Sequence, residues 1–289
     1  MKKFKRKWLS CLCGSLVVLL VLSTSFAMAD CTATYGKGSH HFTLATGSPG
    51  ELGLLNALAE PFNSRHDTAL CWKKAGSGAS LKLLKGKEAD VVMVHAPAAE
   101  KKAVRQGWAI KRTLLGSNEF YIVGPTDDPA QISEAKTAAQ AYTRIAKANA
   151  KFLSRGDNSG THKKEMFIWE KANIKPSGHW YIITQAFMMA TLKKADEIRG
   201  YFMTDSSTWV SAKKDLGNLR ILFQGDPLLI NVYHALCQPE NATPGQPYGL
   251  KFIEFAASEQ GQKIIREYGK DQYGDALYND AEYAKQYEK

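Results

Sequence analysis

The loop at residues 154–165, SRGDNSGTHKKE, gathers a guanidinium, several hydroxyls and two glycines in one short stretch. An apolar pair precedes it and the apolar run MFIW follows, so we expect it to join the end of a strand to the start of a helix. Free N–H groups and the positive end of the helix dipole favour an anion there, unless this is an ordinary capped helix with a surface arginine. Arg155 adds a planar fork of donors that suits a tetrahedral oxyanion. The other groups expected to contribute from this loop are Ser159, Gly160 and Thr161.

Two further loops of the same kind occur earlier in the chain. One follows the strand expected at residues 42–45, and the other follows the strand expected at residues 68–72. Ligands of open α/β sheets bind beyond the carboxyl ends of the strands, so we expect all three loops to face one cleft. The residues expected to contribute from these two loops are Thr46, Gly47, Ser48, Ser77 and Gly78.

Residues 1–29 have the pattern of a secretory signal peptide, with a basic start, an apolar run over residues 8–22 and a terminal Ala-Met-Ala. We expect cleavage before Asp30 and export to the periplasm. The apolar run is short for a spanning helix, so we expect no membrane insertion of the mature chain. Lipid attachment at Cys31 is disfavoured, because Asp30 is a poor fit to the small residue that precedes a lipoprotein cysteine.

The net charge of +10 falls to +5 after cleavage, because residues 1–29 hold five basic residues and no acidic one. No arginine-rich, aromatic-interleaved patch indicates nucleic acid as a partner. A mild positive charge suits a small anion.

Three cysteines remain in the mature chain, which we expect to meet an oxidising compartment. One disulfide and one remaining thiol is the simplest arrangement, and the spacing leaves the pairing open. No Cys-x-x-Cys or Cys/His spacing indicates a zinc site. The three residues are Cys31, Cys71 and Cys237.

The alternation of short apolar strands with helices predicts an α/β fold, and a mature chain of roughly 260 residues suits two lobes. We expect lobe one to contain residues 30–125 and 226–289, and lobe two to contain residues 126–225. Two chain crossings would then act as a two-strand hinge beside a cleft that holds the ligand. The elements expected near the crossings and in the tail include separate strands at residues 112–115 and 120–123 and one helix over residues 251–268.

The chain resembles the tungstate-binding proteins of ABC transporters, which are periplasmic solute-binding proteins of the type II fold. The likeness covers nearly all of the mature chain, and the combination of motifs is more specific than any one of them. The motifs are ATGS at 45–48, ADVVMVHAPAAE at 89–100, NEFYIVGP at 118–125, SRGDNSGTH at 154–162, GHWY at 178–181 and TD at 204–205.

The resemblance implies capture of an oxyanion without chemistry and its delivery to a membrane permease. The family's first-loop hydroxyls correspond to Thr46 and Ser48, its binding arginine to Arg155, and its second-lobe hydroxyls to Ser159 and Thr161. The chain departs from the family at Gly47, where a hydroxyl is common. The resemblance implies tungstate as the first ligand and molybdate as the second, and the departure leaves the choice among oxyanions open. We expect the ligand to be bound by a monomer without a cofactor.

Phosphate is the main alternative ligand, because Arg-x-Asp-x-Ser-Gly-Thr also resembles phosphate-binding proteins. Phosphate carries a proton, and Asp157 could accept it; otherwise Asp157 orients Arg155 or caps the helix. His95 ends an expected strand that faces the cleft, and either contacts the ligand or is a buried structural histidine. His162 and Glu165 are spaced as a metal pair would be, but no third ligand accompanies them.

A phosphoester hydrolase is the alternative from another class of protein. Such an enzyme would need an activated nucleophile or paired carboxylates that hold metals. Serines are available in the three loops, but no nucleophile-elbow pattern or acidic metal cluster accompanies them. The sequence therefore favours a binding protein over an enzyme.

Overall fold

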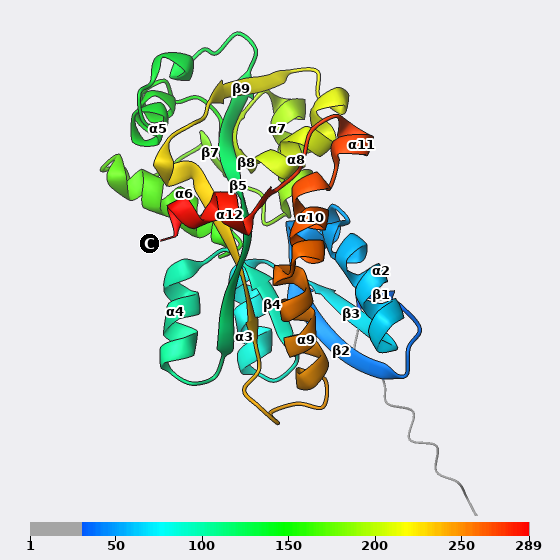
Figure 1. The fold of residues 1–289 in the computed structure, drawn as a ribbon. Helices are drawn as coiled ribbons and strands as arrows, with labels where there is room; N and C mark the ends of the chain where they lie inside the picture. The colour runs from blue at the N-terminus through cyan, green and yellow to red at the C-terminus, as the bar shows by residue number, and fades with distance from the viewer. Residues whose placement is uncertain (1–30, 289) are drawn as a thin grey trace, which may run out of the picture. The chain divides into compact units, whose positions relative to one another are not determined.

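The computed structural model of this chain describes residues 31–288 (Figure 1). The signal peptide predicted at residues 1–29 lies outside this range. Within the described residues, no helix is both long and apolar enough to cross a bilayer. Strands and helices alternate along the chain and one sheet runs through it, so the α/β prediction is confirmed.

One part of the sheet is built from the first strands of the chain and one late strand. In this part β2 (His40–Thr46) lies parallel to β3 (Thr68–Lys74) and to β4 (Val91–Val94). The late strand β10 (Ile230–Cys237) pairs antiparallel with β4. A short edge strand, β1 (Ala33–Tyr35), pairs antiparallel with β3.

The long strand β5 (Ile110–Pro125) connects this part of the sheet to the other part. Its first half pairs antiparallel with β10, and its second half pairs antiparallel with β8 and β9. The expectation of two separate strands here is wrong, because Ser117 and Asn118 continue the ladder opposite Val232 and Asn231. The remaining strands are β6 (Phe152–Ser154), β7 (Tyr181–Ile183), β8 (Tyr201–Asp205), β9 (Leu219–Phe223) and β11 (Asn279–Asp280).

Helices cover both faces of the sheet (Figure 1). The helix expected over residues 251–268 is two helices, because Ser258 caps the second of them by accepting a hydrogen bond from the N–H of Gly261. The helices are α1 (Ser48–Glu51), α2 (Leu54–His66), α3 (Ser77–Lys85), α4 (Pro97–Arg105), α5 (Ala138–Lys147), α6 (Gly160–Lys171), α7 (Met188–Ile198), α8 (Ser206–Ala212), α9 (Gln246–Ala257), α10 (Glu259–Glu267), α11 (Lys270–Tyr273) and α12 (Ala281–Ala284).

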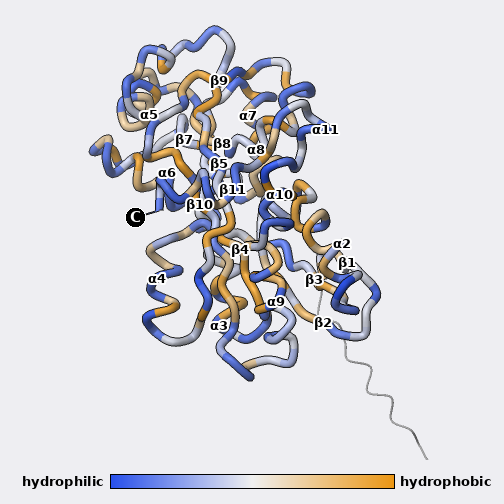
Figure 2. The backbone as a smooth tube through the Cα atoms, in the orientation of Figure 1, coloured by the Kyte–Doolittle hydropathy of each residue, from blue (hydrophilic) through white to orange (hydrophobic). Residues whose placement is uncertain are grey.

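In the first part of the sheet, alternate side chains pack into two separate cores, one on each face. Along β4, Val91 and Met93 join the core under α2 and α9, whereas Val92 and Val94 join the core under α3 and α4. This alternation is expected of a strand that is covered on both faces. Figure 2 shows the hydrophobic residues gathered along β4.

A third buried core belongs to the second part of the sheet. All of its members lie between Phe120 and Leu229, and its largest fully buried side chain is Trp169. Along β5 the buried side chains therefore pass from one core to the other between Leu115 and Phe120. The chain returns to the first core after Leu229, where Tyr233 of β10 joins it.

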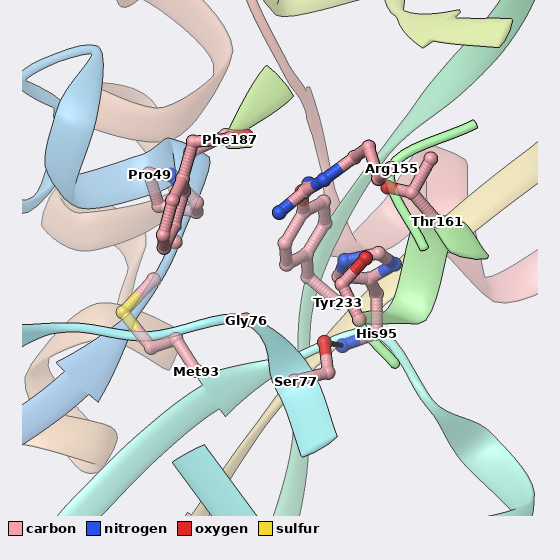
Figure 3. Close-up of a pocket in the computed structure, with 12 residues that line it drawn as sticks. Pro49, Gly76, Ser77, Met93, His95, Arg155, Thr161, Phe187 and Tyr233 are labelled. Atoms are coloured by element: carbon pink, nitrogen blue, oxygen red, sulfur yellow. Dashed lines mark hydrogen bonds between the residues drawn. The ribbon is translucent and has the colours of Figure 1, made fainter. Parts of the chain in front are cut away.

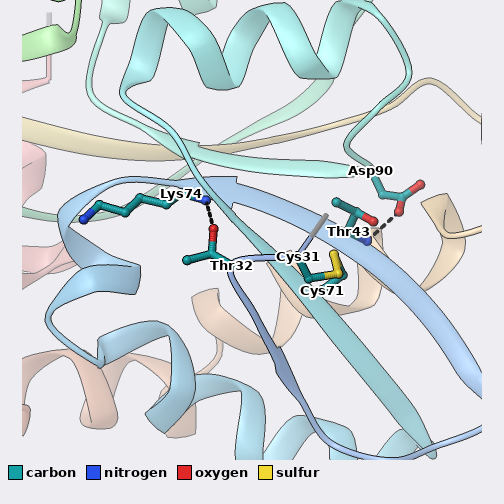
Figure 4. Close-up of a disulfide and its surroundings, with 6 residues drawn as sticks. All are labelled: Cys31, Thr32, Thr43, Cys71, Lys74 and Asp90. Atoms are coloured by element: carbon teal, nitrogen blue, oxygen red, sulfur yellow. Dashed lines mark hydrogen bonds between the residues drawn. A yellow bond between two sulfur atoms is a disulfide. The ribbon is translucent and has the colours of Figure 1, made fainter. Parts of the chain in front are cut away.

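Cys31 and Cys71 form a disulfide with a Cα–Cα distance of 5.4 Å, which selects one of the three pairings left open by the sequence (Figure 4). Cys237 is buried outside this bond, and its thiol donates to the carbonyl of Gln246. The bond fixes the start of the described chain to β3.

Candidate anion-binding site

A small pocket lies where the three predicted loops meet (Figure 3). Its volume of about 10 Å³ is close to the least that admits one water molecule, so the pocket excludes a sugar or a peptide in this conformation. Six of the nine residues predicted for the site line it. They are Gly47, Ser48, Ser77, Arg155, Ser159 and Thr161.

The loop after β6 ends in a helix start that faces the pocket. Ser159 is the N-cap of α6, and its Oγ accepts a hydrogen bond of 3.2 Å from the N–H of His162. Gly156 has a φ of 63° and Asn158 a φ of 57°, so the loop needs residues that tolerate the left-handed region. This turn directs Arg155 and the first turn of α6 toward the same space.

Arg155 is the charged residue of the pocket, and its side chain is only 5% exposed. Its Nη2 donates to Asp157 Oδ2 at 2.5 Å. Its Nε is buried and has no hydrogen-bond partner among the described residues. A buried guanidinium N–H without an acceptor destabilises the protein. A ligand oxygen that accepts a hydrogen bond from this atom would remove that cost and so bind more tightly.

Asp157 is engaged on both oxygens. Oδ2 accepts from Arg155, and Oδ1 accepts from the N–H of Ser159 at 3.1 Å. Asp157 is also absent from the residues that line the pocket. The geometry therefore favours the orienting and capping role that was the alternative to contact with a protonated ligand.

The serines of the pocket differ in what their hydroxyls can offer. Ser77 Oγ accepts from the N–H of His95 at 3.2 Å, as Ser159 Oγ does from His162. A hydroxyl that accepts in this way keeps its own hydrogen to donate to a ligand. Ser48 Oγ instead donates to Asp205 Oδ2 at 3.2 Å, a contact between α1 and the start of α8.

The other three predicted residues lie next to the pocket. Thr46 is buried, and its hydroxyl donates to the carbonyl of Met93 at 2.9 Å. A Cβ atom at Gly78 would meet the carbonyl oxygen of Asn158 at 2.8 Å, and one at Gly160 would meet Nδ1 of His95 at 2.7 Å. The two glycines therefore allow the loops to approach each other closely.

Six lining residues were missing from the predicted set. Gly76 belongs to a predicted loop, and a Cβ atom there would lie 3.0 Å from Cβ of Ser159. His95 was considered for the site from its place at the end of a strand but was not included in the predicted set. The remaining four are apolar or aromatic, and the pattern of hydroxyls and glycines did not point to them. The six are Pro49, Gly76, Met93, His95, Phe187 and Tyr233.

His95 lies at the pocket as a neutral imidazole. Burial, with the Arg155 charge adding to it, lowers its pKa from 6.5 to about 3. The ring lies 5.0 Å from that of Tyr233, centroid to centroid. His95 therefore adds no positive charge to the site at neutral pH, which leaves Arg155 as the cation.

His162 and Glu165, which are spaced as two metal ligands would be, form hydrogen bonds within the protein instead. His162 Nδ1 accepts from the N–H of Asn158 at 3.0 Å, and Glu165 Oε1 accepts from the hydroxyl of Tyr181 at 2.6 Å. Among residues 31–288, no group of three or more His, Cys, Asp or Glu residues could hold a cation. The donors at the pocket suit an anion instead.

Comparison with known proteins identifies the family of this chain. The PBP superfamily domain matches residues 32–260. The tungstate-binding protein TupA of Peptoclostridium acidaminophilum is 35% identical over 278 residues, which cover 91% of this chain and 96% of that protein. Solved structures include the tungstate ABC transporter from Geobacter sulfurreducens, 36% identical with a TM-score of 0.72 over 80% of this chain and 100% of that one. TupA from Desulfovibrio alaskensis G20 is also 36% identical, with a TM-score of 0.69 over 84% of this chain and 99% of that one. This chain therefore belongs to the PBP superfamily, in the family of these tungstate-binding proteins.

Proposed function

We propose that this protein is the substrate-binding subunit of an ABC importer, which captures a tetrahedral oxyanion and delivers it to a membrane permease. The observation that carries the proposal is Arg155, whose buried Nε has no hydrogen-bond partner in the described chain and whose side chain lines a pocket with hydroxyls and a helix start. Tungstate is the first ligand, which agrees with what the relatives are named for, and molybdate is the second.

The chemistry of the donors supports a ligand without a proton. Tungstate and molybdate are fully ionised at neutral pH and accept hydrogen bonds only. Asp157, the acceptor that a protonated phosphate would need, already accepts from Arg155 and Ser159.

Binding is coupled to closure of two lobes, lobe one of residues 30–125 and 226–289 and lobe two of residues 126–225. The close approach of Gly76 and Gly78 to residues 158–159 supports this, since these loops belong to different lobes. A ligand that contacts both loops stabilises the closed arrangement, which the permease then recognises. The protein works as a periplasmic monomer after its signal peptide is removed, and it turns over no substrate.

The experiment is competitive calorimetry on residues 30–289 with tungstate, molybdate, sulfate and phosphate. We expect tungstate to bind with 1:1 stoichiometry and to displace each of the others. Tighter binding of phosphate than of tungstate would replace the proposed ligand. The absence of heat and displacement with all four anions would overturn the function itself.

A further inference from the structure

Phe187 is the aromatic residue that closes one side of the pocket. It is the N-cap residue of α7, in a segment from which the sequence predicted no site residue. Figure 3 shows its ring across the pocket from Arg155. The guanidinium carbon of Arg155 lies 5.2 Å from the ring centroid, within the range of a cation–π interaction.

A second cation covers the same ring from another part of the chain. Lys74 Nζ lies 4.4 Å from the centroid of the Phe187 ring. Lys74 ends β3, in the first part of the sheet, whereas Phe187 and Arg155 belong to the second part. The contact between Lys74 and Phe187 therefore forms only when the loops of the two lobes are together.

Lys74 is held in place for this contact. Its Nζ pairs with Glu51 Oε1 at 2.8 Å, and its backbone N–H donates to Thr32 Oγ1 at 2.9 Å, next to the disulfide (Figure 4). Its side chain is 29% exposed, so the cation keeps part of its hydration while it faces the ring. A cation that is fixed in this way loses little further side-chain entropy when the lobes meet.

The ring has two physical consequences for a bound anion. It packs against Arg155, whose side chain is 5% exposed, and a guanidinium shielded from water attracts an anion more strongly. Its face attracts Lys74 across the gap between the lobes, which stabilises the closed arrangement over the open one. Both effects oppose the departure of the ligand.

We propose that Phe187 is a lid residue, and that its contact with Lys74 slows the release of the bound oxyanion. The inference rests on the proposed function, because it concerns the rate at which that ligand leaves. Phe187 packs against Arg155 and covers the site, and Lys74 holds Phe187 in that place. Neither residue needs to touch the ligand.

The test is the dissociation rate of tungstate, measured by stopped-flow tryptophan fluorescence after mixing with excess molybdate. Phe187→Leu keeps an apolar side chain but removes the aromatic face, and Lys74→Met removes the cation. We expect each variant to release tungstate about three times faster or more, and the double variant to be little faster than Phe187→Leu alone. Phe187→Tyr keeps the ring and should retain the slow release.

The matched control is Lys171→Met. Lys171 lies over the Phe167 ring at 5.2 Å on α6, away from the pocket, so its loss should leave release unchanged. Unchanged release in Phe187→Leu, or fully additive effects of the two substitutions, would overturn the lid while leaving the proposed function intact. If the wild-type protein bound no oxyanion, both proposals would fall together.

Discussion

Arg155 and Asp157 form an ion pair in which Nη2 of the arginine lies 2.5 Å from Oδ2 of the aspartate. The second oxygen of Asp157 accepts from the N–H of Ser159 at the start of α6. One carboxylate therefore fixes the guanidinium relative to the helix that would share the ligand. This arrangement preorganises the donors before an anion arrives.

Replacing Asp157 by Asn tests the orienting role. The amide removes the ion pair, so we expect tungstate affinity to fall by about three- to tenfold. The change in affinity between pH 6 and 8 should match that of the wild type, because Asp157 accepts no hydrogen bond from the ligand. Calorimetry at both pH values measures this, and a selective loss of phosphate binding would instead identify Asp157 as a ligand acceptor.

Substitutions at Arg155 should have the largest effect on affinity. Arg155→Ala removes the charge and every donor, and we expect a loss of about 100-fold or more. Arg155→Lys keeps the charge but lacks the planar fork, so we expect a loss of about tenfold. Arg144→Ala, which removes a surface arginine of α5, is the matched control and should bind as the wild type does. Equal binding by the Arg155 and Arg144 variants would remove Arg155 from the site.

Gly160 should matter although it does not line the pocket. In Gly160→Ala the added methyl would overlap the His95 ring, so the loops could not meet as they do here. We expect tungstate affinity to fall by about tenfold or more, with little change in the unfolding midpoint of the ligand-free protein. Gly217→Ala is the control, because a Cβ atom there meets nothing within 4 Å.

A second substitution separates this overlap from other causes. In a His95→Ala background the ring is gone, and Gly160→Ala should then have almost no additional effect on affinity. Independent, additive losses would contradict the contact as the cause.

The three loops that meet at the pocket could be located from the sequence because their signal is local. A strand followed by glycines, hydroxyls and a helix start is visible within a dozen residues, and Arg155, Ser159 and Ser77 were found in this way. Phe187 and Tyr233 could not be found in this way. They are apolar residues from distant segments, and only the packing of α7 and β10 brings them to the pocket.

The errors in the fold have similar causes. The segment Gly-Ser-Asn at residues 116–118 has the composition of a turn, yet it continues β5. Asn118 is satisfied there by side-chain hydrogen bonds with Ser207 and Asn231, which lie far away in sequence. The strands β1 and β7 have only three residues each, too few for a periodic pattern, and they exist through pairing with β3 and β6.

Glu165 should make stability depend on pH. Burial raises its pKa from 4.5 to about 7, so the native protein holds a proton that the unfolded chain releases between these values. Stability should therefore fall as pH rises through this window, with a slope of at most about 1.4 kcal/mol per pH unit from this residue. Urea unfolding at pH 5 and pH 7.5 measures this, and Glu165→Gln should lose that part of the dependence.

The control for Glu165 is Glu170→Gln, on the exposed side of the same helix. It should retain the full wild-type dependence. If Glu165→Gln also retained it, the buried carboxyl would not be the group that titrates.

The continuity of the core between Phe120 and Leu229 has a consequence for the order of assembly. Every segment of that core is synthesised before β10, whereas the core that contains Phe42 and Leu115 also needs Tyr233 and later residues. The middle of the chain can therefore complete its core before the earlier segments can complete theirs, because those segments need β10 and the residues after it. Until β10 is made, the edges of β4 and of the first half of β5 that it pairs with are left open, and open strand edges favour aggregation of a nascent chain.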